Sequence, residues 1–345
     1  MSSLPAEMLV SVLREKRRIT LESRPVPRPQ PDEVLIRVAS VGVCGSDVHF
    51  WHDGHLGDWV LTEPLVLGHE SSGTIVAVGS DVTPSRIGDR VSIEPQRPNT
   101  TSAETLSGRY NLDPGMRFFA TPGSDGAFAE YVTIQSHFAW AVPKSISDDA
   151  AALMEPLSVG IAAMRKAGIT AGSRVLISGA GPIGIVATQT ARAYGASQII
   201  VSDINTARRD QAASFGATDT IDPQKVDIAT LDFRVDAYID ASGAASAIQA
   251  GIRAVRPGGK VILVGMGQAD MQLPVSVIQN HELLVTGVFR YANTWPTAIG
   301  LVERGLVDLD GLVTGHFPLD QVDAALASTA TAGVLKSIVN PGRRA

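Results

Sequence analysis

The sequence predicts an α/β protein with two domains, the first rich in β-strands and the second built on a doubly wound parallel sheet. A chain of 345 residues exceeds what one hydrophobic core usually supports. Short β-prone runs separated by turns fill the first part of the chain. From about residue 172, strand-like and helix-like runs alternate, which is typical of parallel strands joined by helices.

The first predicted domain begins with a proline-rich connector and continues in short strands. Four prolines between positions 25 and 31 exclude a helix there, because proline lacks the amide hydrogen that a helix interior needs. Strands are predicted at 34–38, 73–79 and 91–93. The polar, weakly periodic stretch 96–114 is expected to form a long loop or lobe.

The second predicted domain begins with a β-branched run at 174–178, which leads directly into the glycine-rich sequence GAGPIG. Apolar residues then recur at helical spacing as far as Tyr194, and a second strand at 198–202 is followed by Asp203. Further strands are predicted at 236–240, 260–265 and 283–289. The tail after about Arg290 loses this rhythm, so we expect it to return to the first domain.

Composition and charge argue against several classes of protein. The net charge of −6 disfavours a nucleic-acid partner, since no basic face is evident to neutralise phosphates. The sequence has no uninterrupted run of about eighteen apolar residues, so we expect no membrane span. The N-terminus lacks the basic segment followed by an apolar segment that characterises a secretory signal. A single cysteine cannot form an intrachain disulfide, so we expect a cytoplasmic protein.

The glycine-rich sequence predicts a dinucleotide site because it follows a strand, opens a helix and precedes an acidic residue at the end of the next strand. Gly179 permits the tight turn, Gly181 lets the backbone approach a pyrophosphate, and Gly184 lets the helix pack on the strand. The N-terminus of the helix offers free amide groups and a partial positive charge to the phosphates.

Asp203 favours NAD over NADP. Its carboxylate can accept hydrogen bonds from the adenosine ribose and would repel a 2′-phosphate. Two alternatives stay open from the residues alone. Asp203 could merely cap a helix that starts near Asn205, and Arg208 could accept a phosphate or pack on adenine.

Cys44 is the only cysteine in the chain, and Gly68-His69-Glu70 follows it within the same β-rich region. A thiolate, an imidazole and a carboxylate are donors that zinc accepts, and three protein ligands with an open position characterise a catalytic site. The residue types alone also allow Cys44 to be a nucleophile or a small buried hydrophobe.

Together these residues resemble the zinc-containing medium-chain alcohol dehydrogenases, and within them the sorbitol/xylitol (polyol) dehydrogenase branch. The resemblance runs over nearly the whole chain and is carried by VGVCGSDVHFW, GHESSGTIVAVG, GRYNL, FFATPGSDGAFAEYV, MEPLSVG, SGAGPIG and GVFRYANTWP. It implies a GroES-like β-rich catalytic domain over 1–157 and 290–345. It also implies an NAD-binding Rossmann domain, with the doubly wound parallel sheet, over 158–289.

The resemblance also implies roles for particular residues. Cys44, His69 and Glu70 are then zinc ligands, and Glu155 is either a fourth ligand or hydrogen-bonded to the metal-bound water. Ser46 and His49 lie where the family keeps its proton relay. Cofactor contacts are implied for Gly179, Gly181, Pro182, Ile183, Gly184, Asp203, Arg208, Val264, Gly265, Met266, Val288, Phe289 and Arg290. The polyol pocket is implied for Phe50, Glu155, Arg290 and Tyr291.

The chain departs from the family pattern in two places. Position 50 is commonly tyrosine in polyol relatives, so Phe50 removes a hydroxyl contact. Relatives with a structural zinc carry four cysteines in the 96–114 lobe, where this chain has Asn99, Ser102, Thr105 and Asp113. None of these is a soft donor, so we predict one zinc per chain and a lobe held by hydrogen bonds or by a neighbouring subunit.

The reaction that the resemblance implies is oxidation of a secondary alcohol of a polyol (sorbitol, xylitol or arabinitol type) to a ketose. Hydride would pass to NAD in a dry cleft between the domains of a homotetrameric enzyme. The alternatives are a butanediol or threonine type of zinc dehydrogenase and a zinc-free quinone or enone reductase. A non-catalytic NAD-binding protein is a further alternative.

Overall fold

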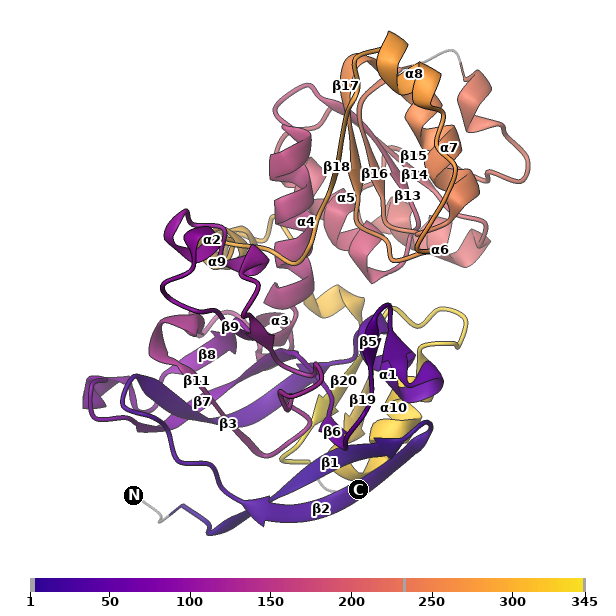
Figure 1. The fold of residues 1–345 in the computed structure, drawn as a ribbon. Coiled ribbons are helices and arrows are strands. Elements are labelled where there is room, and N and C mark those ends of the chain that lie inside the picture. The colour runs from indigo at the N-terminus through magenta and orange to yellow at the C-terminus, as the bar shows by residue number, and fades with distance from the viewer. Residues whose placement is uncertain (1–3, 232–233, 344–345) are drawn as a thin grey trace. The chain divides into compact units, whose positions relative to one another are not determined.

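The structure is a computed structural model that describes residues 4–231 and 234–343. The chain divides into two compact units (Figure 1). Unit 1 comprises Met1–Glu155 and Leu309–Ala345, and unit 2 comprises Pro156–Asp308. Each unit has its own sheet, and each is described separately below.

Unit 1 is mainly β-structure. Its strands are β1 (Glu7–Glu15), β2 (Arg18–Pro25), β3 (Glu33–Gly42), β4 (His55–Leu56), β5 (Trp59–Val60), β6 (Leu65–Val66), β7 (Glu70–Val78), β8 (Arg90–Ile93), β9 (Gln96–Arg97), β10 (Arg117–Phe118), β11 (Tyr131–Gln135), β12 (Ala139–Ala141), β19 (Val313–Pro318) and β20 (Lys336–Asn340). Its helices are α1 (Gly45–Asp53), α2 (Ala103–Leu106), α3 (Asp148–Ala152) and α10 (Val322–Ser328), with short 3₁₀ turns at Pro84–Arg86, Tyr110–Leu112, Ser136–Phe138, Asp310–Leu312 and Leu319–Gln321.

The main sheet of unit 1 contains strands from both segments of the chain that form this unit. Its order is β12-β8-β7-β3-β20-β19, with β11 also paired to β3. Strand β20 pairs antiparallel with the end of β3, placing Ile338 opposite Gly42 and Val339 opposite Val41. The C-terminal segment therefore lies beside the end of β3, immediately before Cys44.

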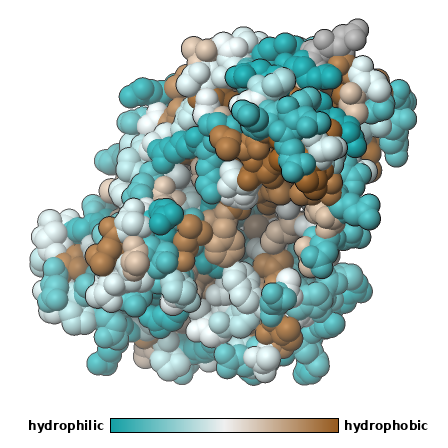
Figure 2. Space-filling model, turned by 45° about the horizontal axis from the view of Figure 1, so that its top comes forward, coloured by the Kyte–Doolittle hydropathy of each residue, from teal (hydrophilic) through white to brown (hydrophobic). Residues whose placement is uncertain are grey.

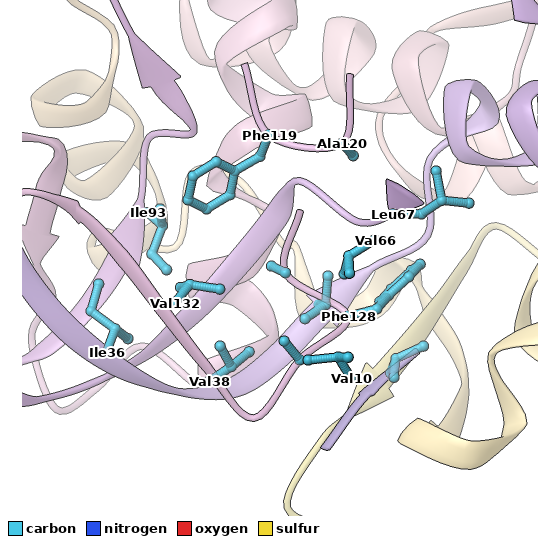
Figure 3. Close-up of a cluster of buried hydrophobic side chains, with 14 of the residues drawn as sticks. Val10, Ile36, Val38, Val66, Leu67, Ile93, Phe119, Ala120, Phe128 and Val132 are labelled. Carbon is cyan, nitrogen blue, oxygen red and sulfur yellow. The ribbon is translucent and has the colours of Figure 1, made fainter. Parts of the chain in front are cut away.

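Hydrophobic side chains from several of these strands form the core of unit 1 (Figure 3). Val10, Ile36 and Ile93 come from three different strands and are at most 1% exposed. Phe128, from the loop before β11, is fully buried in the same cluster. Each such side chain contributes roughly 1.5–3 kcal/mol of hydrophobic stabilisation. This core supports the strand ends that carry the candidate metal ligands.

Unit 2 contains a six-stranded, wholly parallel sheet of order β15-β14-β13-β16-β17-β18. The strands are β13 (Arg174–Ser178), β14 (Gln198–Ser202), β15 (Asp219–Ile221), β16 (Val235–Asp240), β17 (Val255–Leu263) and β18 (Leu284–Gly287). The helices are α4 (Met154–Ala167), α5 (Pro182–Ala193), α6 (Thr206–Ser214), α7 (Ala245–Ala254), α8 (Val275–Asn280) and α9 (Trp295–Glu303), with a 3₁₀ turn at Ile228–Thr230. The strand order reverses between β13 and β16, as in doubly wound dinucleotide-binding sheets.

The carboxyl ends of the central strands lie level with one another. Ser178 of β13 pairs with Ser202 of β14 and with Asp240 of β16. Asp240 pairs in turn with Leu263 of β17. The loops that follow these strands therefore meet at one edge of the sheet, where ligands bind in open α/β sheets.

The sequence analysis predicted every strand of this sheet except β15. The position at which the chain returns to the first domain differs from the predicted one. The segment 290–308, expected in the catalytic domain, belongs to unit 2. The guanidinium of Arg165 on α4 donates to the carbonyl of Asn293 at 2.9 Å, and Gln189 on α5 donates to the carbonyl of Asp308 at 2.9 Å. These contacts and helix α9 hold the segment on unit 2, so the return occurs at Leu309.

Candidate metal centre and dinucleotide site

Cys44 lies at the junction between β3 and helix α1, and it is the residue that precedes the first turn of the helix. The sequence did not predict this helix. Asp47, the third residue of the helix, accepts a hydrogen bond from the amide of Cys44 at 3.0 Å, and the left-handed Gly54 ends the helix. The helix start therefore holds the backbone of Cys44 in a defined position.

Cys44, His69 and Glu70 form a compact group in unit 1. Among the described residues, the potential ligand atoms of these three side chains all lie within 4.8 Å of one another. His69 is 6% exposed and Glu70 is fully buried. The family resemblance implied this group, and the geometry brings a thiol, an imidazole and a carboxylate close together, which is a suitable donor set for zinc.

Asp47 connects the two segments that carry these residues. Its Oδ1 accepts the amide of Gly68 at 2.9 Å and lies 3.6 Å from Nδ1 of His69. Burial favours the neutral acid, but the charge of His69, together with hydrogen bonds from His69 and from the amides of Cys44 and Gly68, lowers the pKa of Asp47 below its ordinary value. A carboxylate beside Nδ1 leaves Nε2 of His69 as the nitrogen available to a metal.

Lys336 of β20 holds one oxygen of Glu70. Its ammonium group donates to Oε1 of Glu70 and, at 2.9 Å, to the carbonyl of Val43. Burial disfavours the charged ammonium, but the negative charges of Glu70 and Cys44 raise the pKa of Lys336 above its ordinary value. Lys336 is therefore a cation that touches both ligand-bearing segments.

The second oxygen of Glu70 supports the metal assignment. Oε2 is buried and lacks a hydrogen-bond partner, although a buried carboxylate oxygen normally has one. A Cβ atom at Gly42 would lie 2.1 Å from this oxygen, so a larger residue there would force the carboxylate to move. An unpartnered oxygen on a carboxylate that groups with a thiol and an imidazole fits a zinc ion.

The other predicted residues of unit 1 differ in their burial and in their contacts. Glu155, in the first turn of α4, is 6% exposed and acts electrostatically on Lys336, but the compact three-residue group does not include it. Ser46 lies in the first turn of α1 and is partly exposed. His49 is exposed, with Nδ1 3.1 Å from Oδ2 of Asp53. Phe50 is 1% exposed within the core of unit 1.

The cysteine-free lobe is held by hydrogen bonds. The amide of Asn99 donates to Asp113 at 2.7 Å, and the hydroxyl of Ser102 donates to Thr105 at 3.0 Å. Burial opposes the charged form of Asp113, but hydrogen bonds from the amide of Asn99 and from Ser102 lower the pKa of this carboxyl below its ordinary value. The four residues at the positions of a structural zinc site therefore hydrogen-bond to one another through oxygen and backbone amide groups.

Glu94 connects this lobe to the neighbouring strand β12. Its buried carboxylate accepts hydrogen bonds from Tyr110 at 2.7 Å, Trp140 at 2.9 Å and Gln96 at 3.1 Å. Burial raises the pKa of Glu94 to about 7, although the hydrogen bonds from Tyr110, Trp140 and Gln96 oppose the shift.

We expect Glu94→Gln to flatten the pH dependence of stability. Between about pH 4.5 and about pH 7, Glu94 is protonated in the folded protein but ionised in the unfolded chain. The free energy of unfolding that Glu94 contributes is therefore fully present below about pH 4.5 and is lost as the pH rises through about 7. The loss amounts to about 3 kcal/mol at most. Urea unfolding of both proteins at pH 5 and pH 8 measures it, and an equal pH dependence in the two would show that Glu94 is not responsible.

In unit 2 the glycine-rich loop connects β13 to α5. Gly179 has φ +93°, and a Cβ atom at Gly184 would lie 1.8 Å from the carbonyl oxygen of Gly179, so both positions require glycine. A Cβ atom at Gly181 would meet nothing within 4 Å. The space beside Gly181, at the start of α5, can therefore take a pyrophosphate against the free amides of the helix.

Asp203 lies at the end of β14 and lines a cavity of about 440 Å³ with Gly179, Gly181 and Arg208. Its Oδ2 accepts the amide of Ala180 at 2.8 Å. The cap of helix α6 is Asn205, whose side chain accepts the amide of Arg208. Asp203 is therefore not the cap residue of α6, but its Oδ1 accepts the amide of Asn205 at 2.8 Å, so its carboxylate contacts both the start of this helix and the glycine-rich loop.

The remaining predicted cofactor and substrate residues of unit 2 follow the next strands of the sheet. Pro182 and Ile183 form the first turn of α5. Val264, Gly265 and Met266 follow β17, and Val288, Phe289 and Arg290 follow β18. Arg290 has φ +56° and lies over the ring of Phe289, with 4.7 Å to the ring centroid. Tyr291 is 1% exposed and packs edge-on against Trp295.

Sequence reasoning missed Asp47, Lys336 and Phe118. Phe118 packs against His69, with 5.5 Å between ring centroids. A carboxylate three residues after Cys44, with Gly54 ending the run, was an available signal for helix α1 and for Asp47. Lys336 carried no such signal, because only the pairing of β20 with β3 brings it to Glu70.

Comparison with known families assigns both halves of the chain. Residues 30–144 match the model described as the alcohol dehydrogenase GroES-like domain, and residues 182–304 match the zinc-binding dehydrogenase model. Together with the fold and the two sites, these matches define the protein as a zinc-binding, NAD-dependent oxidoreductase that acts on a small molecule. The predicted fold class, a GroES-like β-rich domain plus a doubly wound Rossmann domain, is confirmed.

The relatives narrow the class further. Sorbitol dehydrogenase of Gallus gallus is 42% identical over 329 residues, covering 93% of each chain. Sorbitol dehydrogenase of Bacillus subtilis is 39% identical over 350 residues, covering 99% of each chain. The chain belongs to the sorbitol/xylitol (polyol) dehydrogenase branch of the zinc-containing medium-chain alcohol dehydrogenases, as its motifs predicted. A zinc-binding dehydrogenase structure from Sinorhizobium meliloti, bound to NADP, is similar at 30% identity and TM-score 0.91, covering 98% and 100% of the two chains.

The surface view shows polar residues over most of the face drawn, with hydrophobic residues in separate patches (Figure 2). Exposed apolar side chains include Leu106 at 75% and Leu284 at 61%. Within residues 4–231 and 234–343, no helix combines the length and apolar character needed to cross a bilayer.

Proposed function

We propose that this enzyme oxidises a secondary alcohol of a polyol of the sorbitol, xylitol or arabinitol type to the ketose and transfers the hydride to NAD. The observation that carries the proposal is the convergence of Cys44, His69 and Glu70, one of whose carboxylate oxygens, Oε2, has no hydrogen-bond partner. The polyol substrate is supported by the names of the relatives, which are sorbitol dehydrogenases over nearly the whole chain.

Cys44, His69 and Glu70 would hold the zinc ion, with Glu155 as a further ligand or as a partner of bound water. When bound, zinc supplies Lewis acidity, which in other enzymes lowers the pKa of a bound water to about 7. Asp47 keeps the proton of His69 on Nδ1, and Lys336 keeps Oε1 of Glu70 occupied. These contacts would leave one nitrogen and one oxygen directed at the metal.

Ser46 and His49 are proposed to carry the proton released from the substrate hydroxyl. Asp53 accepts from Nδ1 of His49 at 3.1 Å, which favours the tautomer with an unprotonated Nε2. That nitrogen can accept a proton, and the side chain, 52% exposed, can release it to solvent. Phe50, Glu155, Arg290 and Tyr291 remain the proposed polyol-pocket residues.

The activity is tested by following NAD and NADP reduction with sorbitol, xylitol, arabinitol, butanediol and threonine as substrates. The proposal predicts that polyols with NAD give the highest kcat/KM and that chelation of zinc abolishes turnover. Preference for butanediol or threonine would assign another zinc dehydrogenase, and chelator-insensitive reduction of quinones or enones would assign the zinc-free class. Tight NAD binding without turnover of any alcohol would indicate a non-catalytic protein.

We expect Asp203→Ala to reduce the preference for NAD over NADP by about tenfold or more, or about 1.4 kcal/mol. The reason is that the substitution removes the negative charge that would repel a 2′-phosphate in the cavity. The ratio of kcat/KM values for the two cofactors measures the change. Asp210→Ala is the matched control, since Asp210 is an exposed carboxylate on α6. An unchanged ratio in Asp203→Ala would leave the Asp203 carboxylate with only its structural contacts to Ala180 and Asn205.

We further propose that the enzyme is a cytoplasmic homotetramer, as its resemblance to the family implies. Light scattering during size-exclusion chromatography would report four chain masses if this is correct. A monomer or dimer at working concentration would contradict the tetramer.

A further inference from the structure

Three loops of unit 2 pack against one another through their backbones at the carboxyl edge of the sheet. They follow β13, β16 and β17 and comprise residues 179–181, 241–243 and 264–267. A Cβ atom at Gly265 would lie 2.3 Å from the amide nitrogen of Gly243, and one at Gly267 would lie 2.0 Å from its carbonyl oxygen. The loops after β16 and β17 are therefore in direct contact, without room for side chains between them.

Asp240, the last residue of β16, accepts hydrogen bonds from the loops after β16 and β17. Its fully buried carboxylate accepts the amide and hydroxyl of Ser242 at 3.0 and 2.7 Å, and the amide of Gly243 at 3.1 Å. Its backbone carbonyl accepts the amides of Val264 and Gly265, each at 2.9 Å. One residue thus determines where the loop after β16 lies and where the chain leaves β17.

The topology indicates which part of a dinucleotide these loops face. Asp203 directly follows β14 and the glycine-rich loop follows β13, so the adenosine ribose and the pyrophosphate of a bound dinucleotide would lie on the β14–β13 side. A dinucleotide crosses the point where the strand order reverses, which here lies between β13 and β16. The second nucleotide must then extend over the ends of β16 and β17.

We propose that Asp240 is a positioning residue for the nicotinamide half of NAD, an inference that rests on the proposed NAD-dependent function. Asp240 shapes the backbone of the loops after β16 and β17 and need not touch the cofactor. Without its carboxylate, the amides of Ser242 and Gly243 lose their buried acceptor, and the loop after β16 must move to find other partners. The loop after β17 would move with it, because the two are in backbone contact.

The test measures binding of NADH and of 5′-AMP to the purified full-length protein by titration calorimetry. AMP reports the adenosine half, and NADH reports both halves. We expect Asp240→Ala to weaken NADH binding about tenfold, or about 1.4 kcal/mol, and to change AMP binding by less than about twofold. Asp240→Asn keeps one carbonyl acceptor, so it should give an intermediate loss for NADH.

Asp236→Ala is the matched control because Asp236 lies on the same strand at its opposite end. Its carboxylate also accepts a backbone amide, that of Arg174 at 2.7 Å, and it pairs with Arg256 at 2.6 Å. We expect this variant to lose stability while keeping the wild-type ratio of NADH to AMP affinity. A purely structural role for Asp240 would give the same result in both variants.

The proposal is overturned if Asp240→Ala leaves the NADH to AMP affinity ratio unchanged, whether both affinities stay the same or fall together. It is also overturned if Asp236→Ala changes the ratio equally. Retained AMP binding shows that a variant with weak NADH binding is folded. Failure of the wild-type protein to bind NADH would instead refute the proposed function and, with it, this role of Asp240.

Discussion

Cys44→Ser is expected to remove bound zinc and to lower kcat/KM for polyol oxidation at least about a thousandfold, or about 4 kcal/mol of transition-state stabilisation. A serine hydroxyl is a poor zinc ligand compared with a thiolate, and only His69 and Glu70 would remain of the compact donor group. Zinc quantitation by mass spectrometry and steady-state rates of NAD reduction measure the two effects.

The same variant should bind NADH within about twofold of the wild-type affinity. The glycine-rich loop, Asp203 and the cavity beside them belong to unit 2, whereas Cys44 belongs to unit 1. Cys44→Ala serves as a second variant and should behave identically, because the loss comes from the missing thiolate. Retention of zinc with activity within about tenfold of wild type would contradict the ligand assignment.

Lys336→Met is expected to destabilise the zinc-free protein by about 3–5 kcal/mol. The Lys336 and Glu70 side chains are only 3% and 1% exposed, so methionine would leave Glu70 as a buried charge without its cation. Oε2 of Glu70 already lacks a hydrogen-bond partner, so no second contact would compensate in the absence of zinc. Urea unfolding of chelator-treated protein measures the loss.

A double-mutant cycle separates the ion pair from simple packing. In Lys336→Met combined with Glu70→Gln both charges are removed, so much of the lost stability should return. The carbonyl of Val43 also accepts a hydrogen bond from Lys336 in the wild type. It loses this donor in the single Lys336→Met variant and in the double variant alike, so this loss does not affect the comparison between them. If the double variant is as unstable as the sum of the two single variants, the pair does not couple as the structure implies.

Parts of the candidate metal group and of the dinucleotide loop could be predicted because their sequence signals are local. His69 and Glu70 belong to one short motif, and Gly179, Gly181 and Gly184 occur at a spacing that the turn itself requires. Asp203 was also identified, since it ends the strand that follows. In each case the physical constraint acts within a few residues, so a single sequence displays it.

The partners of those ligands could not be predicted because they come from distant parts of the chain. Lys336 and Glu70 are separated by 266 positions, and only the register of β20 on β3 joins them. Asp240 was predicted as the end of a strand, but its contacts depend on how the loops after β16 and β17 pack. Strand register and loop packing are set by the folded environment, not by local pattern.

The return to the first domain was misplaced for a related reason. Helix α9 begins at Trp295 and follows an edge strand, so it continues the strand–helix alternation after one irregular turn with Arg290 and Asn293 at positive φ. That turn interrupts the periodic pattern on which the boundary was based. The contacts of Arg165 and Gln189 then keep the segment on unit 2.

The central claim is a single catalytic zinc, held by Cys44, His69 and Glu70, in a chain whose 96–114 lobe has no metal. The most direct test is the zinc content of the purified wild-type protein, measured by mass spectrometry under native conditions beside Ser102→Ala and Thr105→Ala. The account predicts one zinc per chain in all three proteins, and activity that is lost on chelation and restored by zinc. No bound zinc, or two zinc ions of which one is lost in the lobe variants, would contradict it.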